Sequence, residues 1–361
     1  MSSVKLADLV RSNVQSLKGY QVENACDAIQ MHANENPFPP SADLMGIFRE
    51  CLQETVLNRY PDPACRELKH ALAKRTGSSV DHLVIGNGSD ELIQLILQIF
   101  CKDGDRIVFP DPAFGMYSII AQGMGLSPQP FPLDDQWDFS ADKILTSLAK
   151  SNARVIFFGY PNNPTGNCFS TTEIQEVIEN FSGIVVVDEA YYDFSKKTLL
   201  GQMKDHNNLI ILRSLSKIGL AGLRVGYGLA EPFIIKQLDK VRLPYNSNSL
   251  SQRFAEKVLQ NFTAVDDQIH QIVKERQRLS QALSNIDSLT VFPTDANFIL
   301  FRVSQDATTV FNQLLERGIL VRDLSSHPRL HRCLRVTVGS PQENNRFLDQ
   351  VTGLCEHIQL K

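Results

Sequence analysis

The chain has 361 residues, of which 43% are hydrophobic and 21% are charged, a composition typical of a folded protein rather than a disordered one. Its 36 basic and 40 acidic residues give a net charge of −4 without a basic stripe, so we expect no nucleic-acid partner. The apolar runs are too short to cross a membrane, and the seven cysteines include no C-x-x-C pair, which predicts a cytoplasmic protein without a disulfide framework.

From residue 82 onwards, short apolar segments alternate with helical patterns. We expect strands at 82–85, 106–109, 155–158, 184–187, 209–212 and 224–229, with helices at 91–100, 116–124 and 172–181. Short, fully apolar strands between helices are typical of a mostly parallel sheet that is covered on both faces. The fold class is therefore α/β, with a large domain predicted over residues 41–250.

The pattern changes after residue 250. A polar-rich helical stretch at 251–285 is followed by expected strands at 297–303, around Leu320 and at 334–338, and by helices at 308–317 and from Gln342. This pattern predicts a smaller α+β domain with its own sheet over residues 251–361. Residues 1–40 are predicted to be an arm that packs on the small domain and across the cleft.

The carboxyl ends of three successive expected strands each carry polar residues. Asn163, Asp188 and Lys217 follow the apolar runs at 155–158, 184–187 and 209–212. Each has an ordinary interpretation by itself, as a turn, a helix cap or an exposed lysine. Their joint occurrence favours one ligand crevice, because ligands of open α/β sheets bind at the carboxyl ends of strands. Within it, Lys217 is placed for covalent carbonyl chemistry, and Asp188 requires a cation because it ends an apolar strand.

A glycine pair lies between the first expected strand and its helix, in Gly86-Asn87-Gly88-Ser89-Asp90. Free N–H groups at a helix start, with a serine hydroxyl beside them, form an anion site suited to a phosphate. A plain loop with Asp90 as the helix cap fits the residues equally well. The residues leave both interpretations open.

His327 and His331 are close in sequence but predict no metal site. Pro328 opposes a helix that would present both rings on one face, and no carboxylate or second cysteine joins them.

Together these motifs resemble the fold-type I, pyridoxal-phosphate-dependent aminotransferases, and the wider set resembles the histidinol-phosphate aminotransferase family. The residues that carry the resemblance are Asn34-Glu35-Asn36-Pro37, Arg59-Tyr60-Pro61-Asp62, Gly88-Ser89-Asp90-Glu91, Pro161 to Gly166, Asp188 with Ala190-Tyr191, Ser214 with Ser216-Lys217, Leu220 to Arg224 and Cys333 to Gly339. The match runs from about Leu6 to the C-terminus, and the ordered set is more specific than any one motif. The resemblance implies a seven-stranded sheet between helices.

The resemblance also implies pyridoxal phosphate as cofactor. Lys217 would bind it covalently and carry a proton, Asp188 would pair with its ring nitrogen, and Tyr191 would be the third catalytic residue. The remaining cofactor-binding residues implied are Asn163 with Tyr191 at the ring oxygen, Phe114 against the ring face, Gly88, Ser89, Asp90, Ser214, Ser216 and Arg224 around the phosphate, and Tyr60 from a second subunit. The contribution of Tyr60 implies a homodimer.

For the substrates, the resemblance implies amino transfer between L-histidinol phosphate and 2-oxoglutarate, giving imidazole-acetol phosphate and glutamate in histidine biosynthesis. Arg335 matches the residue that binds the substrate carboxylate, and Tyr20, Asn34 and Arg322 match positions near the substrate. Two features depart from the usual pattern. Phe114 stands where tyrosine is frequent, and the stretch from Lys217 to Arg224 is the shorter of the family's variants.

Other functions remain open at this point. An aromatic or broad-range aminotransferase and a decarboxylase of threonine phosphate fit the same scaffold. A transcriptional regulator on this fold is expected to carry an added DNA-binding segment, and none is expected ahead of Leu6. A nucleotide-binding protein is disfavoured because Gly86 to Ser89 lacks both the G-x-G-x-x-G spacing and a Walker lysine.

Overall fold

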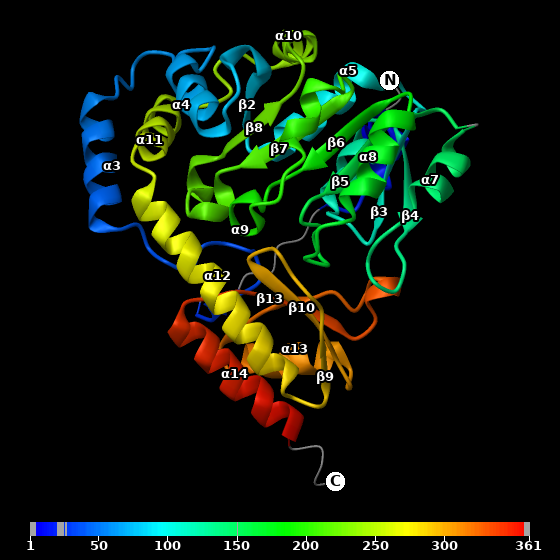
Figure 1. Cartoon of the computed structure of the whole chain (residues 1–361), viewed down its shortest axis with the longest axis vertical. Helices are drawn as coiled ribbons and strands as arrows, with labels where there is room; N and C mark the ends of the chain where they lie inside the picture. The colour runs from blue at the N-terminus through cyan, green and yellow to red at the C-terminus, as the bar shows by residue number, and fades with distance from the viewer. Residues whose placement is uncertain (1–4, 20–24, 26, 150, 357–361) are drawn as a thin grey trace.

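A mostly parallel sheet forms the centre of the large domain in the computed structural model, which describes residues 5–19, 25, 27–149 and 151–356 (Figure 1). Its strands lie in the order β2-β8-β7-β6-β5-β3-β4, and only β8 runs antiparallel to its neighbours. The strands are β2 (Leu83–Asn87), β3 (Arg106–Asp111), β4 (Ser127–Pro132), β5 (Ala153–Gly159), β6 (Ile184–Asp188), β7 (Leu209–Ser214) and β8 (Val225–Leu229). The predicted fold class, including the seven-stranded sheet, is confirmed.

Helices cover both faces of this sheet, because alternate residues of each buried strand point to opposite sides. In β5, Phe157 belongs to the core under α5, α6 and α10, whereas Phe158 belongs to the core under α7 and α8. The large-domain helices are α3 (Ala42–Glu54), α4 (Arg66–Thr76), α5 (Ser89–Phe100), α6 (Met116–Gly123), α7 (Ala141–Leu148), α8 (Thr171–Asn180), α9 (Tyr192–Ser195), α10 (Pro232–Val241) and α11 (Ser249–Gln260), with the short helices η1 (Val80–His82), η2 (Leu200–Lys204), η3 (Ser216–Ile218) and η4 (Ala221–Leu223). Side chains that accept a first-turn N–H begin α3, α8 and α11, at Ser41, Ser170 and Asn248.

The edge strand β4 was not predicted from the sequence. It pairs in parallel with β3 and carries Pro128, Pro130 and Pro132. Proline cannot donate a ladder hydrogen bond, so it is confined to strands with one free edge. The same prolines made the segment look like a loop.

The small domain contains an antiparallel sheet in the order β12-β13-β10-β9. Its elements are β9 (Leu289–Val291), β10 (Phe298–Val303), β12 (Arg322–Asp323), β13 (Cys333–Thr337), α12 (Thr263–Ser284), α13 (Ala307–Glu316), α14 (Pro341–Glu356) and the short helix η5 (Pro328–Leu330). The helical stretch predicted at 251–285 is divided in two at Asn261, which leaves helical geometry at the end of α11. As a result α11 packs on α3 and α4, and α12 crosses to the small domain (Figure 1).

The N-terminal arm contacts both domains. Its strand β1 (Ile29–Gln30) pairs in parallel with β11 (Ile319–Leu320), so the strand expected around Leu320 lies outside the small sheet in which it was predicted. Two short helices, α1 (Leu6–Leu9) and α2 (Ser12–Gln15), precede it. The amide of Asn13 on α2 donates to the backbone oxygens of Gln122 and Gly123 at the end of α6. The domain boundaries themselves stay predictions.

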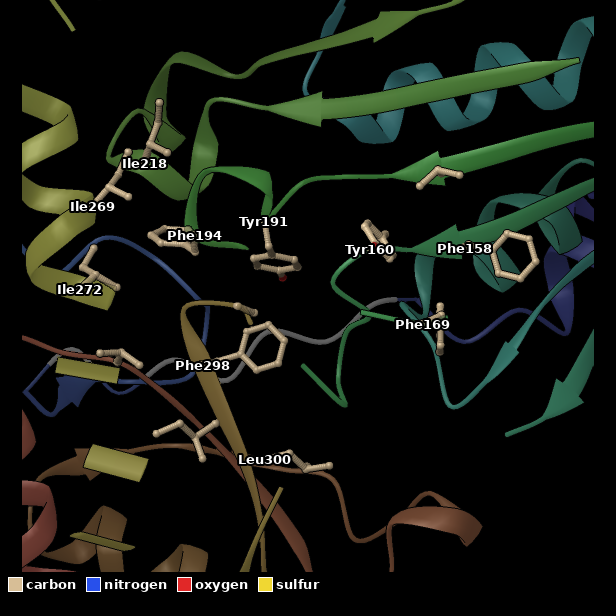
Figure 2. Close-up of a cluster of buried hydrophobic side chains, with 14 of the residues drawn as sticks. Phe158, Tyr160, Phe169, Tyr191, Phe194, Ile218, Ile269, Ile272, Phe298 and Leu300 are labelled. Carbon is tan, nitrogen blue, oxygen red and sulfur yellow. The ribbon is translucent and has the colours of Figure 1, made fainter. Parts of the chain in front are cut away.

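Figure 2 shows that the hydrophobic core continues from the large domain into the small one. The Tyr191 ring, just after β6, meets the Phe298 ring of β10 edge to face with centroids 5.1 Å apart. Ile269 and Ile272 of α12 belong to the same core, beside Ile218 of η3. The two domains therefore meet through packed side chains beside the strand ends. Within the described residues, no helix is both long and apolar enough to span a bilayer.

The fold predicts an intolerance to side chains at Gly226 of β8. A Cβ there would lie 2.3 Å from the Ser89 nitrogen and 2.4 Å from the Gly88 carbonyl carbon, which are backbone atoms at the start of α5. We expect Gly226→Ala to lower the free energy of unfolding by about 1–3 kcal/mol, as overpacking does. Urea unfolding measures this. Gly222→Ala is the control, because nothing lies within 4 Å of its Cβ position; equal midpoints for both variants would contradict the expectation.

Candidate active site

A pocket of about 290 Å³ opens at the carboxyl ends of β5, β6 and β7. It is lined by residues of the large domain, the small domain and the N-terminal arm. The sequence-predicted residues that line it are Asn34, Ser89, Asp90, Phe114, Asn163, Asp188, Tyr191, Ser214, Ser216, Lys217, Arg224, Arg322 and Arg335. Gly88 precedes Ser89 in the chain but is not itself among the residues that line the pocket. Tyr20 lies outside the described residues.

Lys217 reaches the pocket from η3, directly after the fully buried strand β7. Its Nζ donates a hydrogen bond to the backbone oxygen of Ala33 in the arm at 3.2 Å. Burial lowers the pKa of Lys217 to about 8, and the positive charge of Arg335 acts in the same direction. Arg224 also lowers this pKa, but less than Arg335 does. About a tenth of the Lys217 amine is therefore neutral at pH 7, far more than for a lysine of ordinary pKa, and this fraction can act as a nucleophile.

Asp188 is the last residue of β6 and is almost completely buried. Its Oδ2 accepts a hydrogen bond from the Tyr117 hydroxyl at 2.8 Å, and its Oδ1 accepts one from the Ala190 N–H at 3.1 Å. Burial raises the pKa of this carboxyl to about 6, against the two hydrogen bonds, which lower it. At neutral pH the ionised form still prevails, so the pocket floor holds a negative charge that favours a cationic ligand group.

A buried ion pair joins the ends of β6 and β7 behind these residues. The Nε of Arg213 donates to Glu189 at 2.9 Å, and both side chains are almost fully buried. The guanidinium also lies over the Tyr192 ring, 3.6 Å from its centroid, and Thr198 donates to Glu189 at 2.8 Å. Glu189 follows Asp188 and Arg213 precedes Ser214 in the chain, so the pair fixes the turns that present both.

The phosphate-binding residues predicted from the resemblance gather at the start of α5. Ser214 donates to Ser216 at 2.9 Å, and the Arg224 guanidinium lies 3.7 Å from Asp90. Gly88 has a φ of 78°, and a Cβ there would lie 2.4 Å from the Arg224 guanidinium. Asp90 is not the helix cap, because α5 already begins at Ser89 and Gly88 occupies the cap position. Helix N–H groups, hydroxyls and a guanidinium together form a suitable anion site.

Two arginines of the small domain face the same pocket. Arg322 of β12 and Arg335 of β13 are direct cross-strand partners. Like charges placed opposite each other on a sheet repel, and an anion between them relieves that repulsion. Arg335 also donates to the side-chain oxygen of Asn163 and, at 2.7 Å, to the backbone oxygen of His32. The two guanidinium groups are therefore placed to bind a carboxylate or phosphate.

Asn34 connects the arm to both domains at the pocket. Its side chain donates to the Tyr191 hydroxyl at 2.9 Å, and its backbone N–H donates to the Thr337 hydroxyl at 2.9 Å. Its φ of 56° lies in the left-handed region, which asparagine tolerates better than most residues. On the opposite wall, the amide of Asn162 donates to Pro112 at 3.1 Å and so holds the loop that presents Asn163.

Two predicted features lie away from the pocket. Tyr60 is 80% exposed and stacks on Tyr245 with ring centroids 4.4 Å apart, so it does not reach the pocket of its own chain. His327 pairs with Asp111 at the end of β3, with 2.9 Å between Nε2 and Oδ1. This contact ties a small-domain loop to the large domain.

Sequence reasoning missed several residues at the site. Tyr117 contacts Asp188 although 71 positions separate them, so no local sequence pattern predicts the contact. Glu189 and Arg213 could have been found from the sequence. Each is a charged residue beside a buried apolar run, a position that predicts an oppositely charged partner. Glu35 lines the pocket mouth and belongs to the Asn34 motif, but its part in the pocket was not predicted.

A family model for class I and II aminotransferases matches residues 27–351. The chain belongs to this family. It is 42% identical to histidinol-phosphate aminotransferase 2 of Nitrosococcus oceani, over 96% of this chain and 98% of that protein. It is 39% identical to the histidinol-phosphate aminotransferase of Thermoanaerobacter pseudethanolicus, over 95% and 98%. Among histidinol-phosphate aminotransferases of known structure, the Sinorhizobium meliloti protein, in complex with pyridoxal-5'-phosphate, shares the fold with a TM-score of 0.87 at 23% identity, over 97% and 98% of the two chains.

The side chains that line the pocket of this aminotransferase have the chemistry needed to bind pyridoxal phosphate. Lys217 supplies a buried amine with a lowered pKa, which suits bonding to a carbonyl carbon. Asp188 supplies a buried carboxylate, which suits a protonated ring nitrogen. The start of α5 with Ser214, Ser216 and Arg224 suits a phosphate, and Phe114 lines the wall between these groups.

The charges around Lys217 predict opposite effects of two substitutions. Arg335 lowers the pKa of Lys217 and Glu35 raises it. We therefore expect Arg335→Met to raise this pKa and Glu35→Gln to lower it, each by a few tenths to about one pH unit. The neutral amine is the reactive form, so the rate at which apoprotein takes up pyridoxal phosphate should rise with pH through this pKa. Shifts in the same direction in the two variants would contradict the expectation.

Proposed function

We propose that this aminotransferase exchanges the amino group of L-histidinol phosphate with 2-oxoglutarate, giving imidazole-acetol phosphate and glutamate, with pyridoxal phosphate as cofactor. The observation that carries the proposal is one pocket lined by Lys217 and Asp188 from the large domain and by the cross-strand pair Arg322 and Arg335 from the small domain. The names of relatives that are 39–42% identical over nearly their full lengths support the same substrates.

Bound pyridoxal phosphate supplies a carbonyl that bonds to amines and a ring that accepts electrons. The Nζ of Lys217 would hold the cofactor between turnovers. Once released, the neutral Nζ would take a proton from the amine-bearing carbon of the substrate and hold it until it is passed on, as its lowered pKa allows. The carboxylate of Asp188 would hold a proton at the ring nitrogen. Asn163 and Tyr191 would bind the ring oxygen, and Phe114 would pack on the ring face.

The two arginines explain how one site accepts two different substrates. A guanidinium binds a carboxylate and a phosphate with the same pair of parallel hydrogen bonds. In our proposal Arg335 and Arg322 bind the phosphate of histidinol phosphate in one half-reaction and a carboxylate of glutamate in the other. Asn34 closes the pocket from the arm, and Tyr20 is proposed to lie beside the substrate.

We further propose that the active unit is a homodimer in which Tyr60 binds the phosphate of the partner subunit's cofactor. Tyr60 is exposed and stacked on Tyr245, and it is not among the residues that line its own pocket. Large apolar side chains close to these two residues in the sequence are also exposed, namely Leu52, Val56, Leu57 and Leu243. Exposed large apolar side chains are a feature of protein interfaces.

We place the enzyme in the cytoplasm. The cysteines whose side chains are described, Cys51, Cys65, Cys101, Cys168 and Cys333, are free thiols. Unpaired thiols are usual in a reducing compartment.

The substrate assignment predicts a ranking of amino donors. With 2-oxoglutarate as acceptor, kcat/KM should be highest for histidinol phosphate and at least about tenfold lower for phenylalanine, which lacks the phosphate. Threonine phosphate should give no carbon dioxide. Lys217→Ala should keep its fold and lose turnover, because the described residues that line the pocket include no other lysine. A higher kcat/KM for phenylalanine would refute the substrate assignment, and near-normal activity of Lys217→Ala would refute the role of that lysine.

The shared-site arrangement predicts complementation between two defective variants. Lys217→Ala and Tyr60→Ala should each be poorly active alone. Coexpressed in equal amounts, they should recover about a quarter of wild-type activity, because half of the dimers are hybrids with one intact site each. Measurement of kcat on the mixture tests this. Activity no higher than the average of the two variants would show that Tyr60 does not act across subunits.

A further inference from the structure

Tyr117 is the residue that links the two groups expected to contact the cofactor ring. It lies in the first turn of α6 and is 1% exposed. Its ring stacks on Phe157 with centroids 4.8 Å apart and meets the edge of Phe114 at 5.6 Å. Its hydroxyl donates to Asp188 at 2.8 Å. Packing on two sides therefore holds the phenol in place, and its hydroxyl can serve the carboxylate without moving.

We propose that Tyr117 is a positioning residue that keeps the Asp188 carboxylate ionised and directed at the ring nitrogen of the cofactor. The inference rests on the role given to Asp188 in the proposed function, but it is independent of which substrate the enzyme uses.

The hydrogen-bond chemistry favours this role. A phenol donates readily to a carboxylate, and such a charge-assisted bond is stronger than one to a neutral acid. With Tyr117 on Oδ2 and the Ala190 N–H on Oδ1, both oxygens are fixed in direction and each keeps a further lone pair for a donor from the pocket. A ring N–H is such a donor.

The surroundings of Asp188 make this support necessary. The pKa of Asp188 is raised to about 6, chiefly by burial, and the negative charges of Asp90 on α5 and Glu189 in the following turn act in the same direction. Tyr117 and the Ala190 N–H act against them. The cations Lys217, Arg224 and Arg335 line the same pocket. Without the Tyr117 hydroxyl, the Asp188 carboxyl would take up a proton closer to neutral pH. The neutral carboxyl would then no longer attract a protonated ring nitrogen.

The test compares wild type with Tyr117→Phe, which removes only the hydroxyl. The dissociation constant of pyridoxal phosphate is measured on apoprotein from pH 6 to pH 9. Only the ionised Asp188 attracts the protonated ring, so affinity falls as pH falls through the pKa of Asp188 in the apoprotein. Tyr117→Phe should raise that pKa, so the affinity of the variant for pyridoxal phosphate should begin to fall at a higher pH than that of wild type. We expect similar affinities at pH 9 and about tenfold weaker binding than wild type at pH 6.

A second readout follows the ring nitrogen directly. With 15N-labelled pyridoxal phosphate bound at pH 7, the nitrogen chemical shift should report a protonated ring in wild type and a smaller protonated fraction in Tyr117→Phe. Tyr160→Phe is the matched control, because Tyr160 is also buried but its hydroxyl faces Cys168. It should keep the wild-type pH profile and nitrogen shift. An affinity loss in Tyr117→Phe that is the same at every pH would overturn the inference, since a merely structural role gives that result.

A third comparison uses Asp188→Asn, which removes the titrating carboxyl group. In that background, Tyr117→Phe should add no pH-dependent loss of affinity, since two residues that act through one another are not additive. A pH-dependent loss that persists in the double variant would overturn the inference. An unchanged nitrogen shift in Asp188→Asn would overturn it together with the role of Asp188. Turnover of histidinol phosphate by the wild-type enzyme tests the substrate separately.

Discussion

The active-site geometry depends on the buried ion pair between Glu189 and Arg213. Burying two charges costs several kcal/mol for each ion, and only good geometry with further hydrogen bonds offsets that cost. Here Thr198 and the Leu199 N–H bind Glu189, and Tyr192 covers the guanidinium. Because this ion pair is enclosed on all these sides, it has few alternative arrangements. It therefore fixes the positions of the neighbouring residues Asp188 and Ser214 at the ends of adjacent strands.

A second constraint joins segments that are far apart in the chain. Asn34 of the arm is bound by Thr337 and Asn297 of the small domain and donates to Tyr191 of the large domain. Lys217 adds a bond to the neighbouring Ala33. The arm thus completes a pocket whose other walls come from two domains, and the lowered pKa of Lys217 depends on this closure because burial is its main cause.

Much of the fold could be predicted because its signals are local. The apolar runs of β5, β6 and β7 announce buried strands, and parallel strands bring their carboxyl ends together, which is why Asn163, Asp188 and Lys217 meet. Contacts without a local pattern could not be found this way. The bond from Tyr117 to Asp188 joins residues that are 71 positions apart, and the pairing of Arg322 with Arg335 depends on a two-residue strand. The prolines of β4 hid a strand because they also suit loops.

The resemblance to a family added what periodicity could not, namely the cofactor and the residue roles. Tyr60 shows the limit of a single chain, since its proposed task lies on a surface that a second subunit would supply. Those roles stay predictions until the experiments are done, although the structure brings most of the residues concerned to one pocket.

The separation of Arg322 and Arg335 from Lys217 and Asp188 has an evolutionary consequence. The arginines stand on the two paired strands β12 and β13 of the small sheet, whereas the proton-transfer groups stand on the large domain. In the proposed roles, substrate choice and the shared catalytic chemistry therefore lie mainly on separate structural units, although Arg335 also lowers the pKa of Lys217. Substitutions on these two strands that keep Arg335 can then redirect the enzyme to a new amine while the older catalytic chemistry is retained, which suits this scaffold to divergence after gene duplication.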